Sequence, residues 1–206
     1  MIRQYIAKQF TKPDGIAGIL STMVMNVINQ KQYRSVMKHI VHPSDKVLDI
    51  GFGNGYVIKK LLKRGYHKIY GMEISTYMLD KVWCKNQFAI QQKDLQLCIG
   101  NIEKMPYEDN SFDVQYSINT LYFWETLSAG LREMHRIGKQ DSLCILSFYD
   151  KAWLDKISYA KYGFQKYKLQ DVLESCEANG FIVEELEELV KSKSYTVVLK
   201  IKAYDR

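Results

Sequence analysis

Proline is scarce in this sequence, and no linker between domains is evident. The 206 residues include 3 prolines, and neither an internal repeat nor a low-complexity tract is visible. A chain of this length can fill one α/β domain with a complete core and is short for two. The sequence therefore predicts a single domain over residues 1–206.

Cysteine pairs and metal-binding patterns are also lacking. The four cysteines are scattered, with no CxxC spacing and no cluster of histidines beside them: Cys84, Cys98, Cys144 and Cys176. This pattern argues against a disulfide framework and a zinc site, and favours reduced thiols in a cytoplasmic protein. No set of carboxylates and histidines has the spacing of metal ligands, so we expect no bound metal.

No apolar run is long enough to cross a bilayer. The most apolar early segment, GIAGILSTMVMNVI (residues 15–28), is too short for a membrane span. Residues 1–13 are polar and charged, unlike a signal peptide. Apolar residues in 15–28 recur at spacings of 3, 4 and 7, which predicts an amphipathic helix packed on the domain. We expect no membrane contact.

Acidic residues are few in the first third of the chain. Residues 1–72 hold 12 lysines and arginines against 3 acidic residues. Such a region could attract an anionic partner, but lysines such as Lys59, Lys60 and Lys63 are also typical of a solvated helix face. We favour the second interpretation.

Short apolar runs alternate with helical patterns from residue 46 onward. Strands are expected at 46–51, 67–73, 95–100, 111–118 and 142–149, with helices to 64, from Ser75 to about 91, at 126–138 and at 168–180. Gly65, Gly138 and Gly180 suit the left-handed position after a helix end. Two further extended segments, 181–189 and 194–203, are expected to pair antiparallel.

This alternation predicts an α/β fold with a Rossmann-like, doubly wound, mostly parallel seven-stranded sheet and helices on both faces. The C-terminal pair would add an antiparallel strand at one edge. In such sheets ligands bind at the carboxyl ends of the strands, near the point where strand order reverses. The residues that end the early strands are therefore the candidates for a site.

The first candidate is the glycine turn in VLDIGFGNG (residues 47–55). Gly51, Gly53 and Gly55 permit positive φ and a close approach of a ligand to the backbone, ahead of a helix N-terminus. The dinucleotide fingerprint G-x-G-x-x-G places its third glycine one residue later, which disfavours NAD.

Asp49 lies inside the apolar run that precedes this turn. A buried carboxylate costs several kcal/mol unless a charged or donating group satisfies it. A pyrophosphate would be repelled there, whereas an ammonium group would be attracted. The alternative is that Asp49 accepts hydrogen bonds from the nearby turn amides alone.

Glu73 ends the second expected strand. An acidic residue at this place can accept hydrogen bonds from the two hydroxyls of a ribose. Ile74 follows and could lie along an adenine face, with Met78 one helical turn further on.

Three stretches carry a resemblance to a known family: VLDIGFGNG, YGMEIS (residues 70–75) and CIGNIEKMPYEDNSFDVQYSINTLYFWE (residues 98–125). Together they resemble the class I S-adenosylmethionine-dependent methyltransferases, particularly the bacterial small-molecule branch with YFW after the fourth strand. The resemblance extends from about Lys12 to the last strands. The chain departs from the family at Asn101, where Asp is common, and at Gln140-Asp141, where Pro-Gly is usual.

The resemblance implies S-adenosylmethionine as cofactor, with S-adenosylhomocysteine as product. Asp49 would govern the methionine amino group and Glu73 the ribose, while Asn101 and Ile102 would meet the adenine edge and Ser117 would lie near the transferred methyl group. Residues 1–42 would form N-terminal helices that cover the pocket. The residues expected around the acceptor are Asn26, Asn119, Tyr122 and Trp124, with Tyr122 as the candidate catalytic group.

The implied reaction is in-line transfer of a methyl group to a small-molecule acceptor, in a monomer or a homodimer. Two alternatives stay open. A non-catalytic protein that binds S-adenosylmethionine or S-adenosylhomocysteine fits Asn101 and the lack of an evident base. An RNA methyltransferase fits the basic, tyrosine-rich residues 151–168. No RNA-binding module accompanies them, so we favour a small molecule over nucleic acid as the acceptor.

Overall fold

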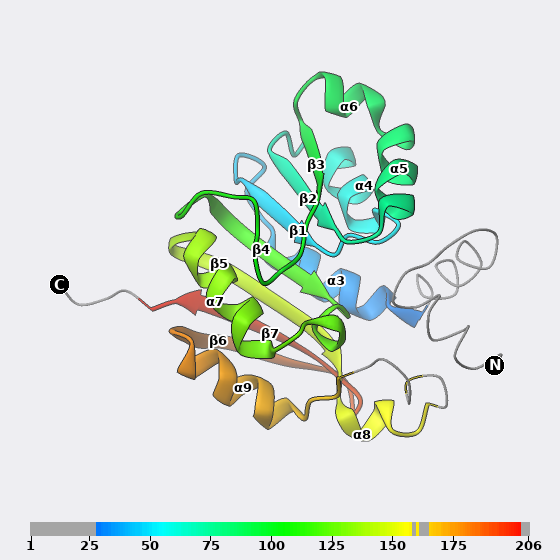
Figure 1. Cartoon of the computed structure of the whole chain (residues 1–206). Helices are drawn as coiled ribbons and strands as arrows, with labels where there is room; N and C mark the ends of the chain where they lie inside the picture. Colours follow the sequence, from blue (N-terminus) through cyan, green and yellow to red (C-terminus); the bar gives the residue numbers. More distant parts are fainter. Residues whose placement is uncertain (1–27, 158–159, 161–164, 203–206) are drawn as a thin grey trace.

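The computed structural model describes residues 28–157, 160 and 165–202. A central sheet with helices on both sides accounts for most of them (Figure 1). The elements are, in chain order, α3 (Gln30–His39), β1 (Val47–Ile50), α4 (Tyr56–Lys63), β2 (Ile69–Glu73), α5 (Thr76–Lys85), α6 (Gln87–Gln91), β3 (Leu95–Ile99), β4 (Phe112–Ile118), the short 3₁₀ helix η1 (Leu121–Phe123), α7 (Leu127–Ile137), β5 (Gly138–Tyr149), α8 (Lys151–Leu154), α9 (Leu169–Ala178), β6 (Phe181–Val190) and β7 (Ser194–Ile201).

The sheet has seven strands in the order β3-β2-β1-β4-β5-β7-β6. Strands β1 to β5 are parallel, and β7 runs antiparallel to both β5 and β6. The predicted fold class is therefore confirmed. The expected place of the antiparallel strand was wrong, because β7 lies inside the sheet and β6 forms the edge. The long β5 can pair with β7 along seven positions, which the sequence pattern did not reveal.

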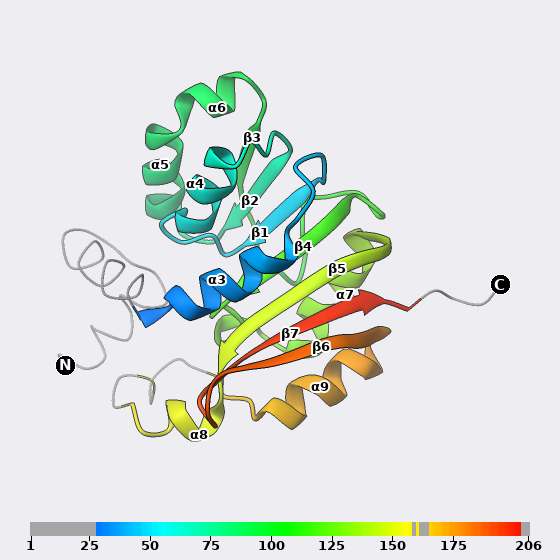
Figure 2. The same cartoon turned by 180° about the vertical axis from the view of Figure 1, so that it is seen from behind.

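Two apolar clusters hold the helices against opposite faces of the sheet. Val36 of α3 and Leu61 of α4 belong to one cluster, while Leu131 of α7 and Val172 of α9 belong to the other. The two opposite views show α3 to α5 on one side and α7 and α9 on the other (Figures 1 and 2). Side chains alternate between the faces along each strand, so Asp49 shares the α3–α4 face with Val47.

Most helix ends follow the sequence. Ser75 caps α5 by accepting a hydrogen bond from the Met78 amide at 3.3 Å, as expected. The helix expected to continue to about residue 91 is interrupted at Asn86, so it forms α5 and α6. Gly65 and Gly180 adopt left-handed φ angles. Gly138 does not: its φ is −75°, and it begins β5 directly.

Residues 15–27 of the expected N-terminal helix, which include the expected pocket residue Asn26, lie outside the described residues, as does most of the expected N-terminal cover. Within the described part of the chain, none of the helices has the length and apolar character to span a membrane. Strand order reverses between β1 and β4, so the predicted ligand site belongs at the carboxyl ends of these two strands.

Candidate functional site

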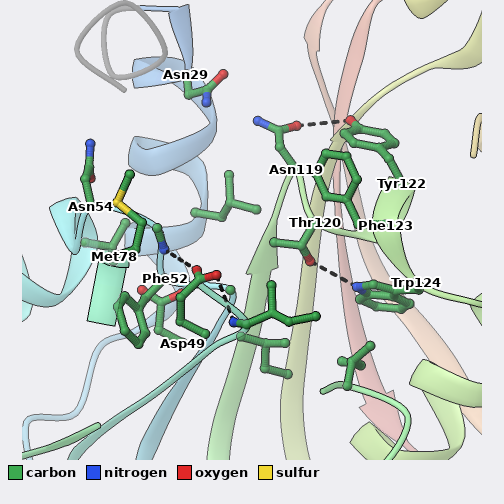
Figure 3. Close-up of a pocket in the computed structure, with 18 of the residues that line it drawn as sticks. Asn29, Asp49, Phe52, Asn54, Met78, Asn119, Thr120, Tyr122, Phe123 and Trp124 are labelled. Atoms are coloured by element: carbon green, nitrogen blue, oxygen red, sulfur yellow. Dashed lines mark hydrogen bonds between the residues drawn. The ribbon is translucent and has the colours of Figure 1, made fainter. Parts of the chain in front are cut away.

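A cavity of about 480 Å³ opens at the carboxyl ends of β1, β2 and β4 (Figure 3). Its lining contains eleven of the residues predicted from the sequence: Asp49, Gly51, Gly53, Glu73, Ile74, Met78, Asn101, Ile102, Asn119, Tyr122 and Trp124. Gly55 and Ser117 are not part of this lining. The structure thus brings these eleven residues together in one cavity, and their roles in binding stay predictions.

The glycine turn supplies the floor of the cavity because its backbone is left-handed. Gly51, Gly53 and Gly55 have φ angles of +74°, +54° and +72°. A Cβ on Gly53 would meet no protein atom within 4 Å, whereas one on Gly55 would come within 2.9 Å of Val82. Gly53 thus faces open cavity, and Gly55 instead allows the start of α4 to pack closely against α5.

Asp49 is 5% exposed, and its Oδ2 accepts a hydrogen bond from the Tyr116 hydroxyl at 2.7 Å. The two residues are direct partners in the β1–β4 register, so their side chains share a face. No turn amide among the described residues donates to Asp49, contrary to the alternative considered above. Burial raises the pKa of Asp49 to about 7, and the nearby Glu73 adds to the rise while the Tyr116 hydrogen bond opposes it.

Glu73 is held by three backbone amides. Its Oε2 accepts from Gly53 at 2.9 Å, and its Oε1 accepts from Ile74 at 2.8 Å and Ser75 at 3.0 Å. These bonds fix the carboxylate between the glycine turn and the end of β2. One acceptor position remains on Oε2, and Glu73, which is 8% exposed, lines the cavity.

Thr120 connects the glycine turn to the aromatic segment (residues 122–124), and no motif in the sequence indicated this contact. A Cβ on Gly51 would lie 2.5 Å from Thr120 Cγ2, so Thr120 packs directly on the turn. Its hydroxyl accepts from Trp124 Nε1 at 3.1 Å and makes a short hydrogen bond with Ser117. The side chain of Ser117 lies on the opposite face of β4 from that of Tyr116. From that face it holds the Thr120 hydroxyl by this hydrogen bond.

The side-chain amides of Asn119 and Gln32 form a hydrogen-bonded pair beside the cavity. Asn119 has a φ of +59°, and its side chain exchanges two hydrogen bonds, of 2.7 and 3.0 Å, with Gln32 of α3. The Tyr122 hydroxyl donates to Asn119 Oδ1 at 3.1 Å and accepts a short hydrogen bond from the Tyr149 amide. Tyr122 is thus tied to two elements, which limits its freedom to act as a base.

Asn101 and Ile102 line the opposite wall. Asn101 is exposed, and its side-chain oxygen accepts from the Glu103 amide at 3.3 Å. Ile102 is 6% exposed and packs close to Gly130 of α7. Asn101 is therefore oriented by a turn of its own loop, while Ile102 is fixed by the core.

Several lining residues come from elements far apart in the sequence. Tyr33 of α3 stacks on Tyr56 of α4 with ring centroids 4.6 Å apart, and burial raises the pKa of Tyr33 to about 12. Trp153 and Lys193 line the cavity from α8 and from the turn between β6 and β7. No motif marks these residues, because only the packing of α3, α8 and the β6–β7 turn brings them to the cavity.

One group of potential metal ligands occurs among the described residues, away from the cavity. The ligand atoms of His39, Glu185 and Glu187 lie within 4.8 Å of one another. Lys38 places its ammonium group 2.9 Å from Glu185 and 3.7 Å from Glu187, so both carboxylates already have a cationic partner in the protein. This arrangement gives no support for a metal centre.

Comparison with known families matches residues 48–146 to a profile described as a methyltransferase domain. Two curated relatives are similar to the chain. The 24-methylenesterol C-methyltransferase 2 of Arabidopsis thaliana is 27% identical over 131 residues, which are 64% of this chain and 33% of the relative. The malonyl-[acyl-carrier protein] O-methyltransferase of Halorhodospira halophila is 28% identical over 129 residues, 61% of this chain and 42% of the relative. The matches thus span less than half of either relative.

Solved structures share the fold. A complex of the Haloferax volcanii Trm112 methyltransferase activator with a methyltransferase superposes with a TM-score of 0.78 at 16% identity, covering 88% of this chain and 93% of that chain. The geranyl diphosphate C-methyltransferase of Streptomyces coelicolor, with Mg²⁺, geranyl diphosphate and S-adenosylhomocysteine, gives 0.73 at 12% identity, covering 84% and 79%. At these identities the likeness establishes the common fold.

Proposed function

Because this chain carries a class I methyltransferase domain, we propose that it transfers a methyl group from S-adenosylmethionine to a small-molecule acceptor. The observation that carries the proposal is the buried carboxylate of Asp49 at the glycine turn. Its hydrogen-bond partner among the described residues is a neutral phenol, Tyr116, and no lysine or arginine among them forms an ion pair with it. The ammonium group of a bound amino-acid moiety would supply that charge.

The cavity fits the rest of this cofactor. Gly53 leaves open space above the turn, and Glu73 presents its remaining acceptor position to a ribose hydroxyl. Ile74, 59% exposed, offers an apolar surface to a flat base, and Met78 adds to the apolar lining. Tyr33 and Tyr56 place stacked rings near Asp49, which suits a cationic ligand.

S-adenosylmethionine, when bound, supplies a methyl group already activated by its attachment to a sulfonium. The residues of this chain then have two tasks, to align the acceptor and to exclude water, and good alignment is worth up to ~7–11 kcal/mol. Tyr122, Phe123 and Trp124 form an aromatic wall at the end of β4 for this purpose. The sterol and malonyl-[acyl-carrier protein] enzymes named above methylate carbon and oxygen respectively, so they support the class of reaction and leave the acceptor atom open.

Calorimetric titration with S-adenosylmethionine, S-adenosylhomocysteine and NAD tests the cofactor. We expect micromolar binding of the first two and none of NAD. Asp49→Ala should weaken binding of S-adenosylhomocysteine more than Asn101→Ala does, because Asn101 is exposed and its side-chain oxygen already accepts from the Glu103 amide. Equal or reversed losses would contradict the assigned places of the two residues.

A non-catalytic binding protein is the second candidate, and the tied hydroxyl of Tyr122 favours it. That hydroxyl already bonds Asn119 and the Tyr149 amide, and no histidine lies in the described lining of the cavity. The test is transfer of label from methyl-labelled S-adenosylmethionine to a panel of small amines, phenols and carboxylic acids. Label in any product supports methyl transfer, whereas tight binding with no labelled product across the panel supports the second candidate.

A further inference from the structure

The two ends of the cavity differ in charge. Its carboxylates, Asp49 and Glu73, lie together at the ends of β1 and β2, where the proposed function places the cofactor. Among the described residues that line the cavity, one carries a positive charge, Lys193. It comes from the turn between β6 and β7, on the side of Tyr149 and Trp153. This second end lies beyond the residues assigned to the cofactor.

Lys193 is held in place by its backbone and by an aromatic ring. Its amide donates to the Val190 carbonyl and its carbonyl accepts from the Asp150 amide, both at 2.9 Å. Its Nζ lies 3.7 Å from the centroid of the Trp153 ring and 5.9 Å from that of Tyr149. The two opposite views place the β6–β7 turn beside α8, which carries Trp153 (Figures 1 and 2). The half-buried ammonium group is therefore oriented over the cavity wall.

No carboxylate in the described part of the chain forms an ion pair with Lys193. Asp150 is adjacent, but its Oδ1 accepts from the Ala152 amide at 2.7 Å and its Oδ2 from the Leu169 amide at 2.9 Å. By contrast, Lys151 and Lys166 of the same region both pair with Asp155. Lys193 thus brings to the cavity a positive charge that no carboxylate of the described residues balances.

Much of the lining outside the residues assigned to the cofactor is apolar. Its apolar side chains include Ile118, Phe123, Trp153, Leu154 and Ile157. We infer that the methyl acceptor is a compact apolar molecule with one anionic group, a carboxylate or a phosphate, and that Lys193 binds this group. That the bound molecule is a methyl acceptor rests on the proposed function. The binding of an anion by Lys193 can be tested without any methyl transfer.

Binding of matched probes tests the anion site. The probes share a phenyl ring: 3-phenylpropanoate and phenyl phosphate are anions, 3-phenylpropan-1-ol is neutral and 3-phenylpropylamine is a cation. Quenching of tryptophan fluorescence reports binding, since Trp124 and Trp153 line the cavity. We expect the anions to bind about tenfold more tightly than the alcohol. The amine, which Asp49 and Glu73 can attract to the other end of the cavity, should not depend on Lys193. The better of the two anions identifies the group, and the anions, unlike the alcohol, should lose affinity with added salt.

Substitutions separate charge recognition from a purely structural contact with Trp153. Lys193→Met should remove the preference for the anions and leave the affinity of the alcohol within twofold, whereas Lys193→Arg should retain the preference. Lys191→Met is the matched control, because this exposed lysine of the same turn does not line the cavity. Equal binding of anions and alcohol by the unaltered protein, or an equal loss of both in Lys193→Met, would overturn the inference.

Failure of the proposed function gives a different result. S-adenosylhomocysteine that does not bind would contradict the proposed cofactor, while the comparison of probes would still report on the charge at Lys193. Normal binding of S-adenosylhomocysteine together with no preference among the probes would leave the cofactor in place and remove the anion site.

Discussion

At the scale of single residues, Asp49 shows how the fold prepares a charge for a ligand. The strand register pairs it with Tyr116, and burial raises its pKa to about 7, which is close to neutral pH. An aspartate on the surface would be ionised at this pH whether or not a ligand were present. Asp49 is instead divided between two protonation states, and a cationic ligand favours the ionised one.

The affinity for S-adenosylhomocysteine should therefore depend on pH. With a pKa raised to about 7, Asp49 in the free protein is mostly neutral at pH 6 and mostly ionised at pH 8. The ligand ammonium group binds the ionised form, so affinity should rise roughly tenfold from pH 6 to pH 8. Calorimetry across this range measures the change. Asp49→Asn should bind weakly with no such slope; a slope that persists in this variant would assign the titration to another group.

The glycines of the turn have separable roles. Gly53 and Gly65 both have positive φ and both leave open space at Cβ, but only Gly53 lines the cavity. Alanine at either position should lower the free energy of unfolding by about 1–2 kcal/mol through backbone strain. Gly53→Ala should also weaken binding of S-adenosylhomocysteine, which Gly65→Ala should not. Denaturant unfolding and calorimetry on both variants check this, and equal affinities would show that the ligand does not approach Gly53.

Gly51→Ala in the same experiment should be more destabilising. Its Cβ would lie 2.5 Å from Thr120 Cγ2, so overpacking adds about 1–3 kcal/mol to the strain. A loss no larger than that of Gly53→Ala would mean that Thr120 moves aside without cost.

At the scale of elements, α3 is attached to the end of β4 by one pair of amide side chains. Gln32 is 1% exposed and exchanges two hydrogen bonds with Asn119, whose left-handed backbone aims its side chain at α3. Tyr33, the next residue of α3, lines the cavity. The amide pair therefore determines how α3 covers the site.

Breaking this pair should loosen α3. Gln32→Ala removes both hydrogen bonds between Gln32 and Asn119 and leaves Asn119 with the Tyr122 hydroxyl, so it should cost about 1 kcal/mol of unfolding free energy for each bond lost. Hydrogen exchange of the α3 amides should be faster, and S-adenosylhomocysteine should bind more weakly. Arg34→Ala, on the exposed side of the same helix, is the control and should change neither quantity. Unchanged exchange in Gln32→Ala would show that apolar packing alone holds α3.

The elements also show what the sequence could predict. Asp49, Glu73 and the glycine turn were predictable because strand ends and glycine spacing are local features. The hydrogen bond between Asp49 and Tyr116 depends on strand register. The positions of Tyr33 and Lys193 at the cavity depend on how α3 and the β6–β7 turn pack. No local sequence pattern therefore indicates either feature. Gly138 was misread because a glycine after a helix is usually left-handed, whereas here Ile201 and Gln115 leave no room for a Cβ.

At the scale of the whole molecule, the cavity lies where two halves of the sheet meet, β3-β2-β1 and β4-β5-β7-β6. Its lining includes Asp49 and Met72 from β1 and β2 of the first half, and Ile118 and Tyr149 from β4 and β5 of the second. The turn after β1 and the segment after β4 meet there through Thr120. A ligand in the cavity would contact both halves at once, and neither half by itself contains the complete lining.

Binding should accordingly stabilise the whole domain in a single transition. At a concentration 100 times its dissociation constant, S-adenosylhomocysteine should add about 2.7 kcal/mol to the free energy of unfolding. For a chain of this size that corresponds to a rise of roughly 5–10 °C in Tm. Thermal unfolding followed by circular dichroism and by tryptophan fluorescence should show the same shift, because both halves contact the ligand. A shift seen by one probe alone would mean that the ligand stabilises only part of the fold, and the cavity would then not couple the two halves.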